Sequence, residues 1–348
     1  MFFASDNAGP VHPKIMQALS DANIGYALGY GADKIMDDVR QQVRDLFEAP
    51  DAAVYLTING TSANALLLAT MTQPWQTIFC ADIAHIQEDE CNAPEFYSQA
   101  KLSLISTVDG KFDSVSLKTR IEAEQNRGVH GVQRGPVSLT QTTEKGTVYT
   151  LDEIRAITDV ARSFGLKTHM DGARFANAMV TLGCSPADMT WKAGIDTVSF
   201  GGTKNGAMGV EACVIFDPDL AWEFELRRKR GGHLLSKHRY LSAQMQAYLT
   251  DGLWIETARA ANARCVQLAE GLRAHNTAQL LFTPQANIIF FQMPRHDHKR
   301  VLDAGAVYYV MNGDVNTGDP DQMLTARLVT DWAMTEQSVS EFLALLRG

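Results

Sequence analysis

Short apolar runs alternate with amphipathic stretches along the first two thirds of the chain. The runs are rich in β-branched and aromatic residues and bounded by glycine or proline, which is typical of buried strands. In the stretches between them, apolar residues recur at helical spacing. We predict strands at 53–59, 77–83, 101–106, 137–141, 166–170, 196–200 and 212–216. We predict helices at 14–20, 37–48, 63–71, 117–125, 151–164 and 219–230.

A long helical tract at 240–274, interrupted only by Gly252, follows this alternation. Beyond the tract, the pattern predicts further helices and three strands, at 288–293, 307–311 and 324–330. Alternating strands and helices predict an α/β fold, in which a mostly parallel sheet has helices on both faces. We therefore expect an N-terminal arm (1–30), a large domain (31–250) and a small C-terminal α/β domain (251–348).

The composition argues against several classes of function. The chain has 348 residues, a net charge of -9 and a pI near 5.5, which disfavours attraction to nucleic acid or anionic lipid. No apolar stretch approaches the length of a membrane span, and the N-terminal segment lacks the apolar core of a signal peptide. The odd, scattered cysteines show no CxxC spacing, which indicates reduced thiols in a cytoplasmic protein and no metal site. They are Cys80, Cys91, Cys184, Cys213 and Cys265.

Lys204 lies among four glycines in the segment SFGGTKNGAMG, directly after the strand predicted at 196–200. Because glycine has no side chain, a ligand can approach the backbone closely here. Burial or a cationic neighbour would lower the pKa of the amine and make it nucleophilic near neutrality. Lys204 is thus a candidate for a Schiff base with a carbonyl group, and the alternative is a solvated loop lysine.

Two further groups of candidates also follow predicted strands. Gly60 and Thr61 begin the helix after the strand at 53–59, where free N–H groups favour a phosphate. The alternative there is an ordinary capped helix. His85 and Glu90 follow the strand predicted at 77–83 and add an imidazole and a carboxylate.

Asp171 follows the strand predicted at 166–170, at the sheet edge where ligands of α/β proteins bind. The alternative for Asp171 is a helix N-cap that pairs with Arg174 three residues later. Tyr30 lies in the glycine-rich segment GYALGYGADK, which could present its ring to a ligand or simply form a packed turn.

In their order along the chain, Gly60-Thr61, His85, Asp171, Arg174 and Lys204 resemble the pyridoxal-phosphate enzymes of fold type I. More narrowly, the chain resembles the L-threonine aldolase group of the β-eliminating lyase superfamily, which includes low-specificity L-threonine aldolases and phenylserine aldolases. The resemblance runs over almost the whole chain. It implies an aspartate-aminotransferase-like large domain and pyridoxal 5'-phosphate as the cofactor.

The resemblance also implies roles for single residues around the cofactor ring. Lys204 would form the internal Schiff base, and Asp171 would pair with the pyridinium nitrogen so that the ring acts as an electron sink. His85 would stack on the ring and relay protons. Arg174 would lie against the phenolic oxygen of the cofactor and lower its pKa.

Other positions are implied to hold the phosphate and the substrate. Gly60 and Thr61 would bind the cofactor phosphate. Ser5 and Arg327 would hold the substrate carboxylate, with the arginine as a bidentate clamp. Tyr30 would lie beside the substrate.

The chain departs from the pattern of the group at two places. Many members carry a histidine in the stretch that corresponds to 141–146, and here Glu144 or a neighbouring residue takes that place. Members also supply a phosphate-binding arginine from the partner subunit after a glycine cluster, and the segment 231–239 offers Lys237 or Arg239 instead. Glu90 and Glu144 are therefore additional candidates for acid–base chemistry, and Lys237 is one for phosphate binding.

The reaction that the resemblance implies is a retro-aldol cleavage of an L-β-hydroxy-α-amino acid, such as L-threonine, L-allo-threonine or L-phenylserine, into glycine and an aldehyde. Elimination at the β-carbon and transfer to serine are alternatives, because the same lysine and aspartate serve them all. A regulatory protein is disfavoured because no basic face or helix-turn-helix extension is seen. A homodimer or homotetramer with sites at the dimer interface is implied.

Overall fold

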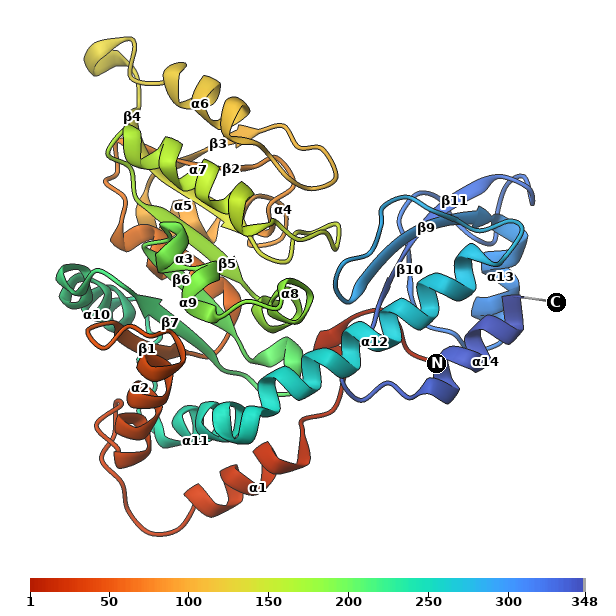
Figure 1. Cartoon of the computed structure of the whole chain (residues 1–348), viewed down its shortest axis with the longest axis horizontal. Helices are drawn as coiled ribbons and strands as arrows, with labels where there is room; N and C mark the ends of the chain where they lie inside the picture. Colours follow the sequence, from red (N-terminus) through yellow and green to blue (C-terminus); the bar gives the residue numbers. More distant parts are fainter. Residues whose placement is uncertain (347–348) are drawn as a thin grey trace.

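The computed structural model describes residues 1–346 and contains two separate β-sheets (Figure 1). The larger sheet has seven strands in the order β1-β7-β6-β5-β4-β2-β3. Its strands are β1 (Ala53–Thr57), β2 (Gln76–Ala81), β3 (Lys101–Ile105), β4 (Gln133–Thr140), β5 (Thr168–Gly172), β6 (Thr197–Gly201) and β7 (Glu211–Ile215). Neighbouring strands from β3 to β6 are parallel, whereas β7 is antiparallel to both β6 and β1. The predicted α/β class with a mostly parallel sheet is confirmed.

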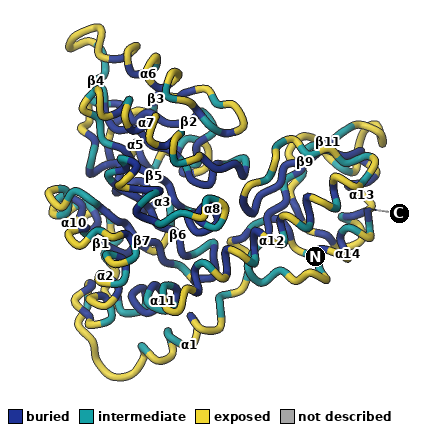
Figure 2. The backbone as a smooth tube through the Cα atoms, viewed as in Figure 1, coloured by how far each residue is buried: buried dark blue, intermediate teal, exposed yellow. Residues whose placement is uncertain are grey.

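Helices cover this sheet and bury its apolar strands (Figures 1 and 2). The helices up to the end of the large sheet region are α1 (Pro13–Ala22), α2 (Lys34–Leu46), α3 (Gly60–Thr70), α4 (His85–Glu88), α5 (Ala93–Ser98), α6 (Ser114–Glu122), α7 (Leu151–Ser163), α8 (Phe175–Leu182), α9 (Pro186–Met189) and α10 (Ala221–Arg230). Every residue of α3 from Ser62 to Thr70 is buried, because α3 packs against α5, α10 and the sheet. The burial of α3 on all sides thus reflects its central position.

The second sheet has four antiparallel strands in the order β10-β11-β9-β8. Its elements are β8 (Gln279–Leu280), β9 (Ile288–Pro294), α13 (Arg295–Asp303), β10 (Tyr309–Val310), β11 (Met323–Val329) and α14 (Glu336–Leu346). Phe3 of the N-terminal arm belongs to the apolar core of this unit, and its backbone bonds to Val307 and Val329. The strand predicted at 307–311 is shorter than expected, since only two of its residues pair in β10.

The helical tract predicted at 240–274 is present, and its predicted interruption at Gly252 is a complete break between two helices. Two helices, α11 (Arg239–Leu249) and α12 (Leu253–Arg273), are separated by a short turn. Asp251 and Gly252 have φ angles of 53° and 70°, which a right-handed helix cannot contain. The helix α12 then runs from the large sheet region to the smaller sheet (Figure 1).

Short 3-10 turns link several of these elements. They are η1 (Asp6–Ala8), η2 (Gly128–His130), η3 (Trp191–Ala193), η4 (Thr203–Asn205), η5 (Pro218–Leu220) and η6 (Thr250–Gly252). Within residues 1–346, no helix is long and apolar enough to cross a membrane.

Candidate active site

Four groups of candidate residues lie at or just after the carboxyl ends of strands in the large sheet. The helix α3 starts at Gly60 directly after β1, and α4 starts at His85 shortly after β2. Asp171 is the penultimate residue of β5, so the strand extends past the predicted end at 170. Lys204 lies in η4, which follows β6. Parallel strands place their carboxyl ends together, and this is where the ligands of such sheets bind.

The backbone around Lys204 is held from several sides. Gly202 N donates to Glu211 Oε2 on β7 at 2.9 Å. Asn205 Nδ2 donates to Tyr248 Oη at 2.8 Å and to the carbonyl of Trp254 at 2.7 Å, so α11 and α12 fix the turn. A nucleophile on this loop is therefore held in a fixed position.

Burial and the positive charge of Arg174 lower the pKa of Lys204. A lowered pKa increases the fraction of neutral amine, which is the nucleophilic form. Burial also raises the pKa of Glu211 to about 7, so the carboxyl group that anchors the loop titrates near neutrality.

Asp171 is 3% exposed, and both of its carboxylate oxygens accept hydrogen bonds. Oδ1 accepts from Ala173 N at 2.9 Å, and Oδ2 accepts from Asn64 Nδ2 at 2.8 Å. Burial alone would raise the pKa of Asp171, but the charge of His85 and the bond from Ala173 N outweigh it, and the pKa is lowered. The site therefore contains a buried carboxylate that stays ionised.

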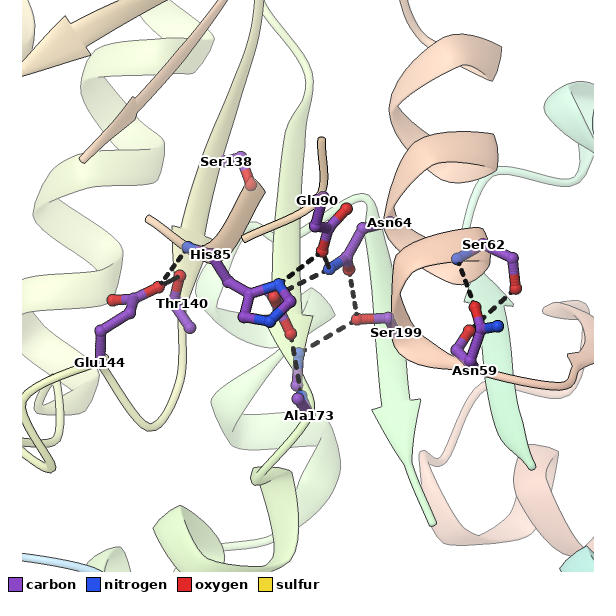
Figure 3. A network of polar contacts seen from close by, with 12 residues as sticks. Asn59, Ser62, Asn64, His85, Glu90, Ser138, Thr140, Glu144, Ala173 and Ser199 are labelled. Carbon is purple, nitrogen blue, oxygen red and sulfur yellow. Dashed lines mark hydrogen bonds and ion pairs between the residues drawn. The ribbon is translucent and has the colours of Figure 1, made fainter. Parts of the chain in front are cut away.

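His85 contacts two glutamates (Figure 3). Its Nδ1 lies 2.8 Å from Glu90 Oε1, and this hydrogen bond raises the pKa of the imidazole. Its backbone N donates to Glu144 Oε1 at 2.9 Å, and Thr140 Oγ1 donates to the same oxygen at 2.9 Å. Burial raises the pKa of both glutamates. Among the described residues, neither Glu90 Oε2 nor Glu144 Oε2 has a hydrogen-bond partner.

The alternative in which Arg174 pairs with Asp171 is wrong, because Arg174 pairs with Asp6 of the N-terminal arm. Arg174 Nε and Nη2 donate to the Asp6 carboxylate at 2.7 and 2.9 Å. Asn287 Nδ2 donates to Asp6 Oδ2 at 3.0 Å, so the carboxylate joins the arm to both sheet regions. Ser5, the residue before Asp6, caps η1 by accepting from Asn7 N at 3.1 Å.

The N-terminal arm also contacts Arg327 of β11. Arg327 Nη2 donates to the carbonyl of Ala4 at 3.3 Å, which places this arginine beside Ser5. Within residues 1–346, the buried Nε of Arg327 has no partner. The arginine therefore keeps a hydrogen-bond donor for a further anion.

Tyr30 and Lys237 lie together, in a different region of the same chain. Tyr30 N donates to the carbonyl of Ser236 at 3.1 Å, and its ring contacts Lys229, whose Nζ is 4.9 Å from the ring centroid. Tyr30 is 54% exposed.

The start of α3 offers donors for an anion. Asn59 caps this helix, and its side chain and carbonyl accept from Ser62 N at 2.8 Å and from Ala63 N at 3.2 Å. The N–H groups of Gly60 and Thr61 have no partner inside the helix, because the first turn lacks preceding carbonyls. The helix dipole adds to their attraction for a phosphate.

Three residues of this site were not predicted from the sequence: Asn64, Asp6 and Glu211. Asn64 is a polar residue in the middle of an otherwise apolar helix, a pattern that indicates a buried hydrogen-bonding role. The strand that contains Glu211 is likewise apolar apart from that residue. Asp6 gives no such signal, because a short loop with an aspartate is common.

The sheet order, with a lysine after β6 and an aspartate at the end of β5, defines a pyridoxal-phosphate enzyme of fold type I. A family model described as beta-eliminating lyase matches residues 3–294, and the chain belongs to this family. It is 39% identical over 348 residues to the low specificity L-threonine aldolase of Pseudomonas sp. (strain NCIMB 10558), which covers 99% of this chain and 97% of that protein. It is 41% identical over 314 residues to the low specificity L-threonine aldolase of Pseudomonas aeruginosa, over 90% of each chain.

Solved structures agree with this family. The threonine aldolase of Leishmania major superimposes with a TM-score of 0.92 at 26% identity, over 99% of this chain and 98% of that chain. Serine palmitoyltransferase of Sphingomonas wittichii has a TM-score of 0.71 at 14% identity, over 99% of this chain and 86% of that chain, and shows the shared fold alone. The predicted family and fold class are confirmed.

Proposed function

We propose that this protein is a pyridoxal-phosphate-dependent aldolase that cleaves L-β-hydroxy-α-amino acids of the threonine type into glycine and an aldehyde. The observation that supports it most is the meeting of Lys204, Asp171 and His85 at one sheet edge, in a chain closely similar to two low specificity L-threonine aldolases. The curated relatives support this reaction over elimination and over transfer to serine.

The residues present fit pyridoxal phosphate. Gly60 and Thr61 offer two N–H groups to the phosphate, and Lys204 offers an amine of lowered pKa to the aldehyde carbon. Asp171 offers an ionised carboxylate to the ring nitrogen. When bound, the cofactor supplies an electron sink for the pair of electrons that is released as the Cα–Cβ bond breaks.

Asp171 and Arg174 act on the charge of the ring. With the cofactor bound, the Asp171 carboxylate would hold a proton at the ring nitrogen, because an ionised and hydrogen-bonded carboxylate favours a cationic partner. Arg174 is already fixed by Asp6, and its positive charge favours the ionised form of the phenolic oxygen.

His85 is the candidate that takes the proton of the β-hydroxyl group. Its Nδ1 is engaged by Glu90 Oε1, which leaves Nε2 as the nitrogen that accepts a proton from a substrate. Glu90 orients the imidazole. Glu144 fixes the backbone of His85 and contributes a second carboxyl group of raised pKa.

Arg327 and Ser5 hold the substrate carboxylate in this proposal. The bond from Arg327 Nη2 to the Ala4 carbonyl holds the arginine against the backbone next to Ser5, and Arg327 Nε has no partner in residues 1–346. Binding through a carboxylate selects α-amino acids and orients the Cα–Cβ bond.

The proposal includes a dimer or tetramer in which each site is completed by the neighbouring chain. Tyr30 and Lys237 would then serve the partner's substrate and phosphate. The exposed apolar side chains of Ile24, Tyr26 and Leu28, next to Tyr30, support an interface there. The free cysteines within the described residues support the cytoplasm as the compartment.

A product assay tests the reaction. Purified protein loaded with pyridoxal phosphate is incubated with L-threonine, L-allo-threonine and L-phenylserine in turn. The proposal expects glycine and the matching aldehyde in equal amounts, whereas ammonia and a keto acid would indicate elimination. Lys204→Ala is expected to lose both this activity and the visible absorption band of the wild-type protein. A colourless wild type that takes up no cofactor contradicts the proposal.

A further inference from the structure

An amide side chain joins two buried carboxylates in the wall of the site. Asn64, on α3, is 1% exposed, and its Nδ2 donates to Asp171 Oδ2 at 2.8 Å and to Glu90 Oε1 at 3.0 Å. The same Glu90 oxygen lies 2.8 Å from His85 Nδ1 (Figure 3). A continuous chain of hydrogen bonds therefore runs from Asp171 to His85.

Ser199 fixes which way the amide faces. The Ser199 hydroxyl oxygen accepts from Gly172 N at 3.2 Å, and the hydroxyl group then donates to Asn64 Oδ1 at 2.8 Å. With its oxygen engaged, Asn64 turns both hydrogens of its NH2 group to the carboxylates. No other uncharged side chain of this size offers one acceptor and two donors in this geometry.

We propose that Asn64 is a positioning residue that joins Asp171 and His85 into one rigid hydrogen-bonded unit. This inference rests on the proposed function. It couples the carboxylate assigned to the ring nitrogen to the imidazole assigned to the β-hydroxyl proton. Without the Asn64 amide, the buried carboxylates of Asp171 and Glu90 would each lose one hydrogen-bond donor. Loss of a partner is costly in a buried polar network.

The sign of the effect on proton binding follows from the contacts. Each bond from Asn64 Nδ2 stabilises an ionised carboxylate, so its removal raises the affinity of Asp171 and of the Glu90–His85 pair for protons. Activity requires these groups to have lost their protons, and the acid limb of the pH profile therefore moves to higher pH. The titratable groups that face the unit also include His169, Lys204, Glu144 and Glu211.

The test compares Asn64→Ala, Ser199→Ala and wild type, each loaded with pyridoxal phosphate. Two pH profiles are recorded for each protein: kcat/KM for L-threonine cleavage, and the visible absorption of the loaded protein without substrate. We expect Asn64→Ala to move the acid limb of both profiles up by about one pH unit. Ser199→Ala keeps the amide but frees its orientation, and it is expected to move both profiles in the same direction by a smaller amount.

Asn177→Ala is the matched control. Asn177, on α8, is also a buried amide, and its Nδ2 donates to Asn262 Oδ1 at 2.9 Å. Its removal should lower the melting temperature without moving either pH profile, so general destabilisation is separated from a positioning role. Equal shifts in the control and in Asn64→Ala would overturn the inference.

An active, folded Asn64→Ala enzyme with unchanged profiles also overturns the inference, while the proposed function stands. If Asn64→Ala does not fold, Ser199→Ala decides by the same criterion. A wild type that binds cofactor but cleaves none of L-threonine, L-allo-threonine and L-phenylserine overturns the proposed function, and this inference with it.

Discussion

The ion pair between Asp6 and Arg174 gives the sharpest stability prediction. Its carboxylate is 1% exposed and its guanidinium 15% exposed, and two hydrogen bonds of 2.7 and 2.9 Å join them. Asp6→Ala removes the carboxylate and leaves the arginine buried without its counter-charge. Breaking a buried pair from one side costs about 3 kcal/mol. For a chain of this size, the melting temperature should fall by about 4 °C.

Urea unfolding of four proteins measures this coupling: wild type, Asp6→Ala, Arg174→Met and the double variant. Each single substitution leaves the other member of the ion pair buried without its partner, whereas the double substitution removes both members. The double variant should therefore lose less than the sum of the single losses, by about 2 kcal/mol. The proposed coupling would be refuted if the losses in free energy of unfolding were additive, or if Asp6→Ala lost less than about 1 kcal/mol.

The exposed pair of Asp37 and Arg40 is a matched control. Its carboxylate oxygen also lies 2.7 Å from the arginine, but the Asp37 side chain is 72% exposed. Because water already solvates both groups, Asp37→Ala should cost no more than about 0.5 kcal/mol. An equal loss in the two pairs would mean that burial does not control the energy.

The same pair predicts a dependence on pH. Burial would raise the pKa of Asp6, but the charges of Arg174 and Lys204 outweigh it and lower the pKa below 3.8. A depressed carboxyl pKa stabilises the folded protein above the pKa of the unfolded chain, and this stability disappears as the pH falls through the folded value. The stability difference between wild type and Asp6→Ala should therefore shrink in acid.

Further predictions concern the lysine loop and the substrate. Burial raises the pKa of Glu211 from 4.5 to about 7, so the folded protein binds this proton more tightly than the unfolded chain. The free energy of unfolding of wild type relative to Glu211→Gln should therefore fall as the pH rises from about 5 to about 7. Tyr248→Phe removes a hydrogen bond to the Gly201 carbonyl and one of the two bonds from Asn205 Nδ2, and denaturant unfolding should show a loss of stability of about 2 kcal/mol. Arg327→Ala should lower kcat/KM for L-threonine by about 100-fold, measured as aldehyde release.

Each of these has a contradicting outcome. Parallel pH curves for wild type and Glu211→Gln would mean that the carboxyl group does not titrate in this range. A Tyr248→Phe variant as stable as wild type would mean that the Tyr248 hydroxyl group does not stabilise the lysine loop. An Arg327→Ala enzyme with unchanged kcat/KM would exclude this arginine from substrate binding.

Local rules predicted much of the site's framework from the sequence. The strand and glycine turn before Gly60, and the strands before Asp171 and Lys204, follow from patterns within a few residues. Their meeting at one sheet edge follows from parallel topology. These are the parts of the structure that short-range physics determines.

The remaining features depend on contacts that no local pattern encodes. Arg174 pairs with Asp6, which is far away in the sequence, whereas the partner that the local sequence offered as an alternative was its near neighbour Asp171. The interruption predicted at Gly252 is a complete break because Asp251, a non-glycine residue, also adopts the left-handed conformation, which the sequence does not indicate. Asn64 shows its importance only once Glu90 and Asp171 are placed beside it.

β1 is an outermost strand of the large sheet, and this position has a consequence for biosynthesis. Among residues 1–346, β1 pairs only with β7, and Val54 pairs with Val214, which the ribosome adds roughly 160 residues later. At about 5–20 residues per second, the nascent β1 and the apolar helix α3 that follows it wait about 10–30 s for that neighbour. During this interval their apolar surfaces are open to chaperones and to aggregation, so the yield of soluble enzyme should respond to chaperone supply and to translation speed between these two strands.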